Sequence, residues 1–256
     1  MRDIWWKPFA LGLMAIPATV GAAPCELRSG PHRNPVIELY TSEGCSSCPP
    51  ADRWLSKLRQ PLAEEPVQPV IMAFHVSYWD YIGWIDRFAQ PAFNERQREL
   101  ARREGRAGVY TPQLVRDGKD WPQWFRSDAR AILEPAPGRL ERASASILLR
   151  RNAQGLVQAS VTPVSPAQRW EAYWTVTEND HQTKVRSGEN RGEALKHDFV
   201  VRGYERVAAT TGPARLAWKP PAAEGDRAQQ INLVVTDAQT GLPLQALSLA
   251  CAAPLS

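Results

Sequence analysis

The sequence predicts an α/β domain followed by an all-β, sandwich-like domain. Apolar runs at 36–40 and 70–74 flank a segment, 51–58, whose apolar residues recur at helical spacing. Further along the chain, short segments that alternate apolar and polar residues replace this pattern, as in a β-sandwich. The change falls at the Pro- and Gly-rich stretch 135–138. We therefore expect the two domains at residues 34–135 and 139–256.

In the first domain, each strand or helix is predicted from its own pattern. Ala51, Trp54, Leu55 and Leu58 lie at i, i+3, i+4 and i+7, which places them on one face of a helix. Pro112 suits the start of a short strand, because it removes no interior hydrogen bond there. The expected order is a strand at 36–41, this helix, a strand at 70–74, a polar helix at 91–103, a strand after Pro112 and a last helix before 135.

The second domain shows strands but no catalytic motif. We expect His181 and His197 to lie on the surface, and 188–192 to form a connecting turn. The expected strands cover 143–149, 156–161, 170–177, 199–201, 231–235 and 244–249.

Two cysteines directly after the first strand carry the most specific chemical signal. Cys45 and Cys48 are separated by two residues, and we expect both on the first turn of the following helix. Sulfurs at this spacing form and break a disulfide, and a helix N-terminus lowers the pKa of a nearby thiol. We predict that Cys45, at the exposed start of the helix, is the nucleophile and that Cys48 resolves the mixed disulfide.

The end of the second strand should supply side chains next to the cysteines. Parallel strands joined by a helix end at the same edge of a sheet, so His75, Tyr78, Trp79 and Asp80 are expected there. We assign Tyr78 and Trp79 to substrate binding. His75 and Asp80 are candidates for a proton relay.

The strand, the cysteine pair and a later Thr111-Pro112 before a strand resemble the thioredoxin fold. This resemblance implies an α/β thioredoxin-like first domain, in which Pro112 is cis and lies opposite the cysteines. It also implies that Thr111 presents its backbone to a substrate. The chain is more specifically similar to an exported bacterial thioredoxin-like family, domain-of-unknown-function family 1223. The segments that carry this similarity are 43–52, 75–80 and 110–114.

The sequence also departs from ordinary thioredoxins beside the cysteines. Glu43-Gly44 replaces the usual tryptophan, and Ser46-Ser47 lies between the cysteines. Glu43 would oppose ionisation of Cys45 if the two side chains were close. The direction of electron transfer therefore stays open.

The N-terminus predicts export. Basic Arg2 and Lys7 precede a short apolar run, and small residues follow at 21–23, as in a signal peptide covering 1–22. An uncleaved anchor is the alternative, but the apolar run is short for a membrane span. Outside the cytosol an even number of cysteines favours a structural disulfide between Cys25 and Cys251, with lipidation of Cys25 as the alternative.

Together these features predict an exported thiol–disulfide oxidoreductase, periplasmic or secreted, that uses Cys45 and Cys48. Expected partners are protein thiols or disulfides and a redox partner protein, with no cofactor and no membrane contact after signal cleavage. The net charge of +4 without a basic block argues against nucleic acid. Two alternatives remain, a copper or zinc protein that uses Cys45, Cys48 and His75, and a non-catalytic binding module.

Overall fold

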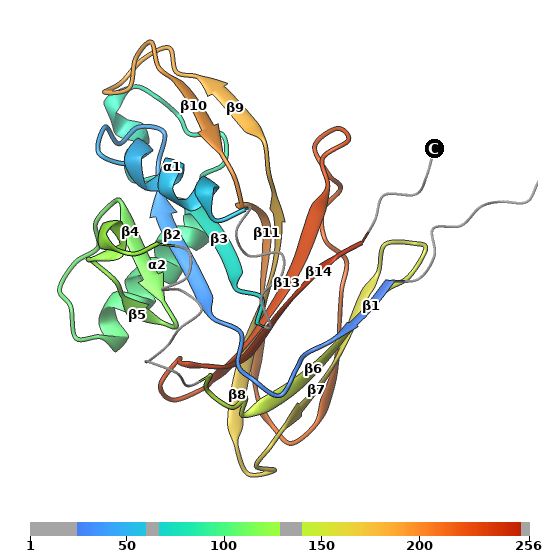
Figure 1. Cartoon of the computed structure of the whole chain (residues 1–256). Coiled ribbons are helices and arrows are strands. Elements are labelled where there is room, and N and C mark those ends of the chain that lie inside the picture. Colours follow the sequence, from blue (N-terminus) through green and yellow to red (C-terminus); the bar gives the residue numbers. More distant parts are fainter. Residues whose placement is uncertain (1–24, 60–66, 129–139, 252–256) are drawn as a thin grey trace, which may run out of the picture.

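The computed structural model describes residues 25–59, 67–128 and 140–251 (Figure 1). The predicted signal peptide at 1–22 and the predicted change of pattern at 135–138 lie outside these residues. Within the described segments strands dominate, and the chain forms two α-helices and two short 3-10 helices.

The described part that precedes residue 129 contains both α-helices. Its strands are β1 (Cys25–Arg28), β2 (Val36–Thr41), β3 (Val70–His75), β4 (Gln113–Arg116) and β5 (Lys119–Asp120). Its helices are α1 (Pro49–Lys57) and α2 (Pro91–Arg103), with 3-10 helices η1 (Asp80–Ile82) and η2 (Trp124–Arg126). The last helix predicted before residue 135 is represented only by η2 up to residue 128, and residues 129–139 lie outside the description.

The part from residue 140 onward consists of strands. They are β6 (Ala145–Arg151), β7 (Val157–Pro163), β8 (Arg169–Glu178), β9 (His181–Lys184), β10 (Ala194–His197), β11 (Val200–Thr211), β12 (Ala214–Trp218), β13 (Gln229–Asp237) and β14 (Pro243–Ala250). Each strand predicted in this part is found, although several are longer than their apolar run.

Strands from both parts of the chain form one mixed eight-stranded sheet, in the order β14-β13-β8-β11-β3-β2-β4-β5. At the junction, Val200 of β11 pairs with Ala73 of β3 in parallel and with Glu178 of β8 in antiparallel orientation. The predicted fold class, an α/β thioredoxin-like domain with a C-terminal all-β sandwich-like domain, is therefore wrong. The described chain is mostly β. Side-chain periodicity identifies strands. It does not identify which strands are neighbours in a sheet, because neighbouring strands are joined by main-chain N–H and C=O groups that nearly all residues share.

A second sheet, β1-β6-β7-β12, packs against the β14, β13 and β8 end of the large sheet. The core between them includes Trp170 and Trp174, both of which are fully buried. Trp218 of β12 stacks on Trp174. In Figure 1 this second sheet lies at the opposite end of the molecule from α1 and the β9–β10 hairpin.

Strands β2 and β3 are buried on both faces, which explains their continuous apolar runs. On one face, Ile37 and Leu39 pack with Leu55 of α1. On the other face, Phe74 packs with Phe93 of α2. The loops at the C-terminal ends of these two strands hold the cysteine pair and the segment after His75.

A largely buried ion pair joins α2 to the sheet. Arg96 forms a salt bridge with Glu38 of β2, and its guanidinium lies 3.8 Å from the ring centroid of Tyr173. Glu38 also accepts hydrogen bonds from the hydroxyls of Tyr40, at 2.9 Å, and Tyr173, at 2.6 Å. Burial by itself lowers the pKa of Arg96, but the charge of Glu38 prevails and raises that pKa well above its ordinary value.

Replacing Arg96 with methionine should destabilise the protein strongly, because it leaves the carboxylate of Glu38 buried without a counter-ion. We expect a loss of about 3–5 kcal/mol in the free energy of unfolding, measured by urea denaturation. The control is Arg98→Met on the same helix, where an exposed pair with Glu95 should contribute less than about 1 kcal/mol. Adding Glu38→Gln to Arg96→Met should restore much of the loss. Equal effects of the two single variants would contradict this account.

Candidate functional site

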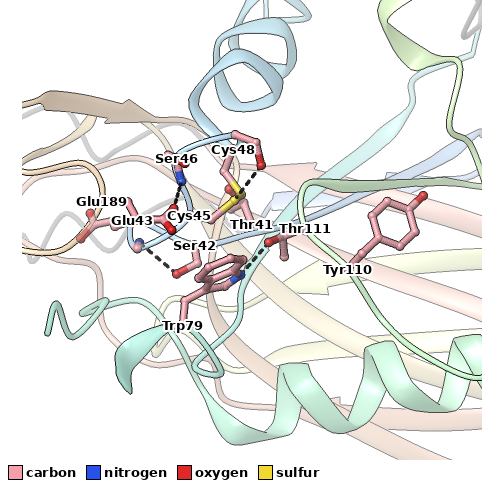
Figure 2. Close-up of a disulfide and its surroundings, with 12 residues drawn as sticks. Thr41, Ser42, Glu43, Cys45, Ser46, Cys48, Trp79, Tyr110, Thr111 and Glu189 are labelled. Carbon is pink, nitrogen blue, oxygen red and sulfur yellow. Dashed lines mark hydrogen bonds between the residues drawn. A yellow bond between two sulfur atoms is a disulfide. The ribbon is translucent and has the colours of Figure 1, made fainter. Parts of the chain in front are cut away.

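The cysteine pair lies in the turn between β2 and α1. The amide of Cys45 donates to the carbonyl of Ser42 at 3.1 Å, and the amide of Cys48 donates to that of Cys45 at 3.2 Å. The two sulfurs form a disulfide, with Cα atoms 5.4 Å apart. Figure 2 shows this bond at the centre of the site.

The cysteines lie differently on the helix from what we predicted. Cys48 is the N-cap of α1, and its carbonyl accepts the amides of Ala51 and Asp52. Cys45 precedes the helix instead of lying on its first turn. Of the two cysteines, Cys48 is therefore the nearer to the positive end of the helix dipole. Pro49 and Pro50 occupy the first helical positions, where amide donors have no intrahelical partner.

Both cysteines are buried, which corrects the prediction of an exposed Cys45. Cys45 is 1% exposed and Cys48 is 0% exposed. The turn between β9 and β10 covers this segment, because the side-chain amide of Asn190 donates to the main-chain carbonyls of Glu43, at 2.8 Å, and Cys45, at 3.0 Å. The sequence predicted this turn but not where it packs.

Ser46 and Ser47, between the cysteines, face solvent. The hydroxyl of Ser47 lies 3.3 Å from the sulfur of Cys45. The amide of Ser46 donates to the carboxylate of Glu189 in the same β9–β10 turn, at 3.0 Å. The exposed edge of the disulfide loop is therefore polar.

Thr111 lies beside the disulfide in Figure 2, and the bond between Thr111 and Pro112 is cis. The hydroxyl of Thr111 accepts a hydrogen bond from the indole of Trp79 at 2.7 Å. Figure 2 shows Thr111 and Glu189 on opposite sides of the disulfide. The pairing of β4 with β2 brings this segment to the cysteines, since Gln113 pairs with Tyr40.

Of the other predicted residues, Tyr78 contacts α2, whereas Asp80 and His75 both contact Asp86. Tyr78 is partly buried and donates to Gln97 of α2, and burial raises the pKa of Tyr78 to about 12. Asp80 accepts the amide of Asp86, whereas His75 contacts the side chain of Asp86 at 2.6 Å. The carboxylate paired with His75 is thus that of Asp86, which sequence reasoning missed, and not that of Asp80.

A buried group of acids and histidines lies around the cysteine turn. His197, at the end of β10, is 2% exposed, and its Nδ1 lies 3.4 Å from Oδ1 of Asp52. Its Nε2 lies 3.3 Å from Oε1 of Glu43, without hydrogen-bond alignment. The rings of His75 and His197 meet edge to face, with centroids 4.9 Å apart. The carboxylates that flank the cysteines in sequence therefore converge on one histidine.

The ionisation of this group follows from its charges. Burial by itself lowers the pKa of His197, but the carboxylates of Asp52 and Glu43 prevail and raise it to about 10. Burial by itself raises the pKa of Asp86, but His75 and the amides of Glu43 and Phe88 prevail and lower it. Asp86 is accordingly an ionised acceptor for His75.

The prediction that His181 and His197 lie on the surface is wrong, since both are buried. The sequence around His197 could have predicted its burial, because Leu195, His197 and Phe199 alternate with Lys196 and Asp198. That alternation places the histidine on the apolar face.

His181 belongs to a separate cluster with Glu178 and Glu224. Its Nε2 lies 3.0 Å from Glu178, and burial lowers the pKa of His181, helped by nearby arginines. The guanidinium groups that pair with Glu178 or Glu224 come from Arg87, Arg202 and Arg227.

The other two cysteines form the second disulfide. Cys25 at the start of β1 is bonded to Cys251, directly after β14, with Cα atoms 5.8 Å apart. The described segments contain no helix that is long and apolar enough to cross a membrane.

Residues 36–236 match the sequence model of a family described as protein of unknown function, DUF1223. The chain belongs to this family. The match covers most of the chain, including both cysteines of the turn, the Thr111–Pro112 segment and His197. A search of curated proteins found no match.

Two solved structures share the fold of this DUF1223 protein. Protein AGR_C_4864 of Agrobacterium tumefaciens matches with a TM-score of 0.62 and 23% identity, covering 89% of this chain and 99% of that chain. HBP35 of Porphyromonas gingivalis matches with a TM-score of 0.60 and 13% identity, covering 85% of this chain and 74% of that chain. At these identities the likeness concerns the fold alone.

Proposed function

We propose that this protein exchanges electrons with other proteins through the Cys45–Cys48 disulfide, outside the cytosol. The observation that carries the proposal is the disulfide itself, closed by two cysteines in one turn, with Cys48 at the N-terminus of α1. A thiolate that leaves from Cys48 would lie at the positive end of the helix dipole. The predicted signal peptide and the two disulfides support a periplasmic or secreted location.

The exchange follows from this geometry. A substrate thiolate attacks the sulfur of Cys45, the Cys45–Cys48 bond breaks, and Cys48 leaves as a thiolate that takes up a proton. The second substrate thiolate then attacks the substrate sulfur of the mixed disulfide and releases Cys45. Two electrons have passed to the protein and the substrate holds a disulfide. The same steps in reverse reduce a substrate disulfide.

A redox titration tests this proposal. The full chain is equilibrated in glutathione and dithiothreitol buffers of graded potential, and free thiols are counted by alkylation and mass spectrometry. We expect Cys45 and Cys48 to titrate together as a two-electron couple in the folded protein, while Cys25–Cys251 stays oxidised. If Cys45–Cys48 opens only when the fold melts, it is a structural bond and the binding-module alternative is favoured. The alternative in which Cys45, Cys48 and His75 hold copper or zinc stays a prediction.

The burial of Cys45 gives a second expectation. Replacing Asn190 with alanine removes two hydrogen bonds that hold the β9–β10 turn over the cysteine segment. At about 1 kcal/mol for each bond, the open form should become roughly thirty-fold more populated. Reduction of Cys45–Cys48 by dithiothreitol, followed by thiol alkylation, should accelerate by up to that factor.

The control for this variant is Asn152→Ala, which breaks a comparable turn between β6 and β7, far along the chain from the cysteines. It should leave the rate of reduction unchanged. Equal rates for wild type and Asn190→Ala would show that the turn does not control access to the sulfurs.

A further inference from the structure

Three buried side chains from three different elements converge beneath the cysteine turn. Asp52 of α1, His75 of β3 and His197 of β10 each offer one ligand atom, and these atoms all lie within 4.8 Å of one another. We propose that Asp52, His75 and His197 bind a divalent cation of the zinc class. This site is separate from the sulfurs and does not depend on their redox activity.

His75 is oriented as a metal ligand by a partner on its far side. Its Nδ1 lies 2.6 Å from Oδ2 of Asp86. Asp86 also accepts the amides of Glu43, at 2.8 Å, and Phe88, at 2.9 Å, so the carboxylate is held in place as an acceptor. In the neutral ring of His75, Nδ1 then carries the proton, and Nε2 holds the lone pair. Metal-bound histidines are commonly oriented by a carboxylate in this way.

Nε2 of His75 is the unexplained atom of the group. His75 is 0% exposed, and among the described residues Nε2 has no hydrogen-bond partner. A buried acceptor without a partner is unfavourable. A cation between His75, Asp52 and His197 would use this lone pair.

His197 and Asp52 are spaced as two ligands of one ion. Nδ1 of His197 lies 3.4 Å from Oδ1 of Asp52. With bonds of about 2.0–2.1 Å, two ligands of a tetrahedral zinc ion lie roughly 3.4 Å apart. The other atoms of these groups face different partners. Oδ2 of Asp52 accepts the hydroxyl of Thr41 at 2.8 Å, and Nε2 of His197 lies 3.3 Å from Glu43.

The donor set and the charge around it indicate the class of ion. Two imidazoles and one carboxylate suit zinc and related first-row metals, and leave room for a water or another ligand. Glu43 lies next to His197, and Asp86 lies next to His75, so a dication also offsets negative charge in this buried region. The competing arrangement is a protonated His197 between Asp52 and Glu43, which leaves Nε2 of His75 without a partner.

A second cluster of this kind in the described part of the chain, Glu178, His181 and Glu224, provides the comparison. Its carboxylates are already paired with Arg87, Arg202 and Arg227. Three guanidinium groups supply the positive charge there, so a cation gains little. A substitution at His181 is therefore a matched control.

The test uses the full chain with both disulfides oxidised, so that no thiol is available to bind metal. The protein is unfolded with a chelator, freed of metal, and refolded with or without Zn²⁺ or Co²⁺, because the ligands are buried. We expect one bound ion per chain by elemental analysis. X-ray absorption of the loaded protein should show two imidazoles and no sulfur. A higher unfolding temperature in the presence of Zn²⁺ is also expected.

Substitutions of the proposed ligands and of Asp86 test which side chains bind the ion. His75→Gln and His197→Gln should lose the bound ion, and Asp86→Asn should weaken binding about ten- to a hundred-fold. His181→Gln should keep it, and near-ultraviolet circular dichroism checks the fold of each. If a ligand variant does not fold, the absorption spectrum of the wild type decides. No uptake by wild type, sulfur in the metal shell, or uptake that survives both His75→Gln and His197→Gln would overturn the proposal.

Discussion

Replacing Cys45 with serine is expected to abolish thiol–disulfide exchange in both directions, because the sulfur that bonds to the substrate is then missing. Replacing Cys48 with serine should have a different result. The free thiol of Cys45 can still attack a substrate disulfide, but nothing resolves the product. A covalent complex with the substrate should accumulate, visible as a band that disappears on reduction.

The measurement is the rate at which the reduced protein reduces a disulfide-containing substrate protein, followed by free thiol release. The control is Ser46→Ala, which keeps both sulfurs and the backbone contact to Glu189. It should retain activity. Unchanged exchange in Cys45→Ser, or a trapped complex formed by Cys45→Ser and not by Cys48→Ser, would contradict the assigned roles.

Removing the Cys25–Cys251 disulfide should produce the largest loss of stability. The bond closes a loop with a sequence separation of 226 residues, and chain-entropy arguments give about 5 kcal/mol for a loop of that length. It also fastens β1, a strand of four residues, to the end of β14. We expect the Cys25→Ala, Cys251→Ala double variant to unfold at a much lower urea concentration.

The matched control is the double alanine variant of Cys45 and Cys48. That disulfide closes a loop with a sequence separation of only 3, for which the same relation gives about 2 kcal/mol. The variant without Cys25 and Cys251 should therefore lose more stability. The reverse order would mean that the bond near the termini does not restrict the unfolded chain.

Much of the local structure was predictable because it depends on neighbouring residues. The stripe formed by Ala51, Leu55 and Leu58 packs on the sheet as its spacing requires. The polar helix α2 (Pro91–Arg103) has the predicted bounds. The cysteine motif, with its Pro49–Pro50 start of a helix, was also visible in the sequence.

The candidate site was only partly predictable. The parallel strands placed Trp79 near the cysteines, because such strands end at one edge of a sheet, and the resemblance to the thioredoxin fold placed Thr111–Pro112 there. It did not show that Asn190 covers Cys45, or that His197 lies against Asp52 and Glu43. These contacts join residues about 145 positions apart, and no local pattern encodes them.

By itself, the sequence determined helices α1 and α2, the strands with apolar or alternating runs, and which two sulfurs lie in the turn before α1. Those properties follow from apolar spacing, proline and cysteine positions over short stretches. The tertiary structure alone decided that β11 joins β3 to β8 in one sheet, and that the β9–β10 hairpin closes over the cysteines. Strand neighbours are joined by main-chain N–H and C=O groups, which nearly all residues share, so the residue types do not specify which strands pair. The burial of Cys45 and the contact between His75 and His197 therefore appear only after the chain has folded.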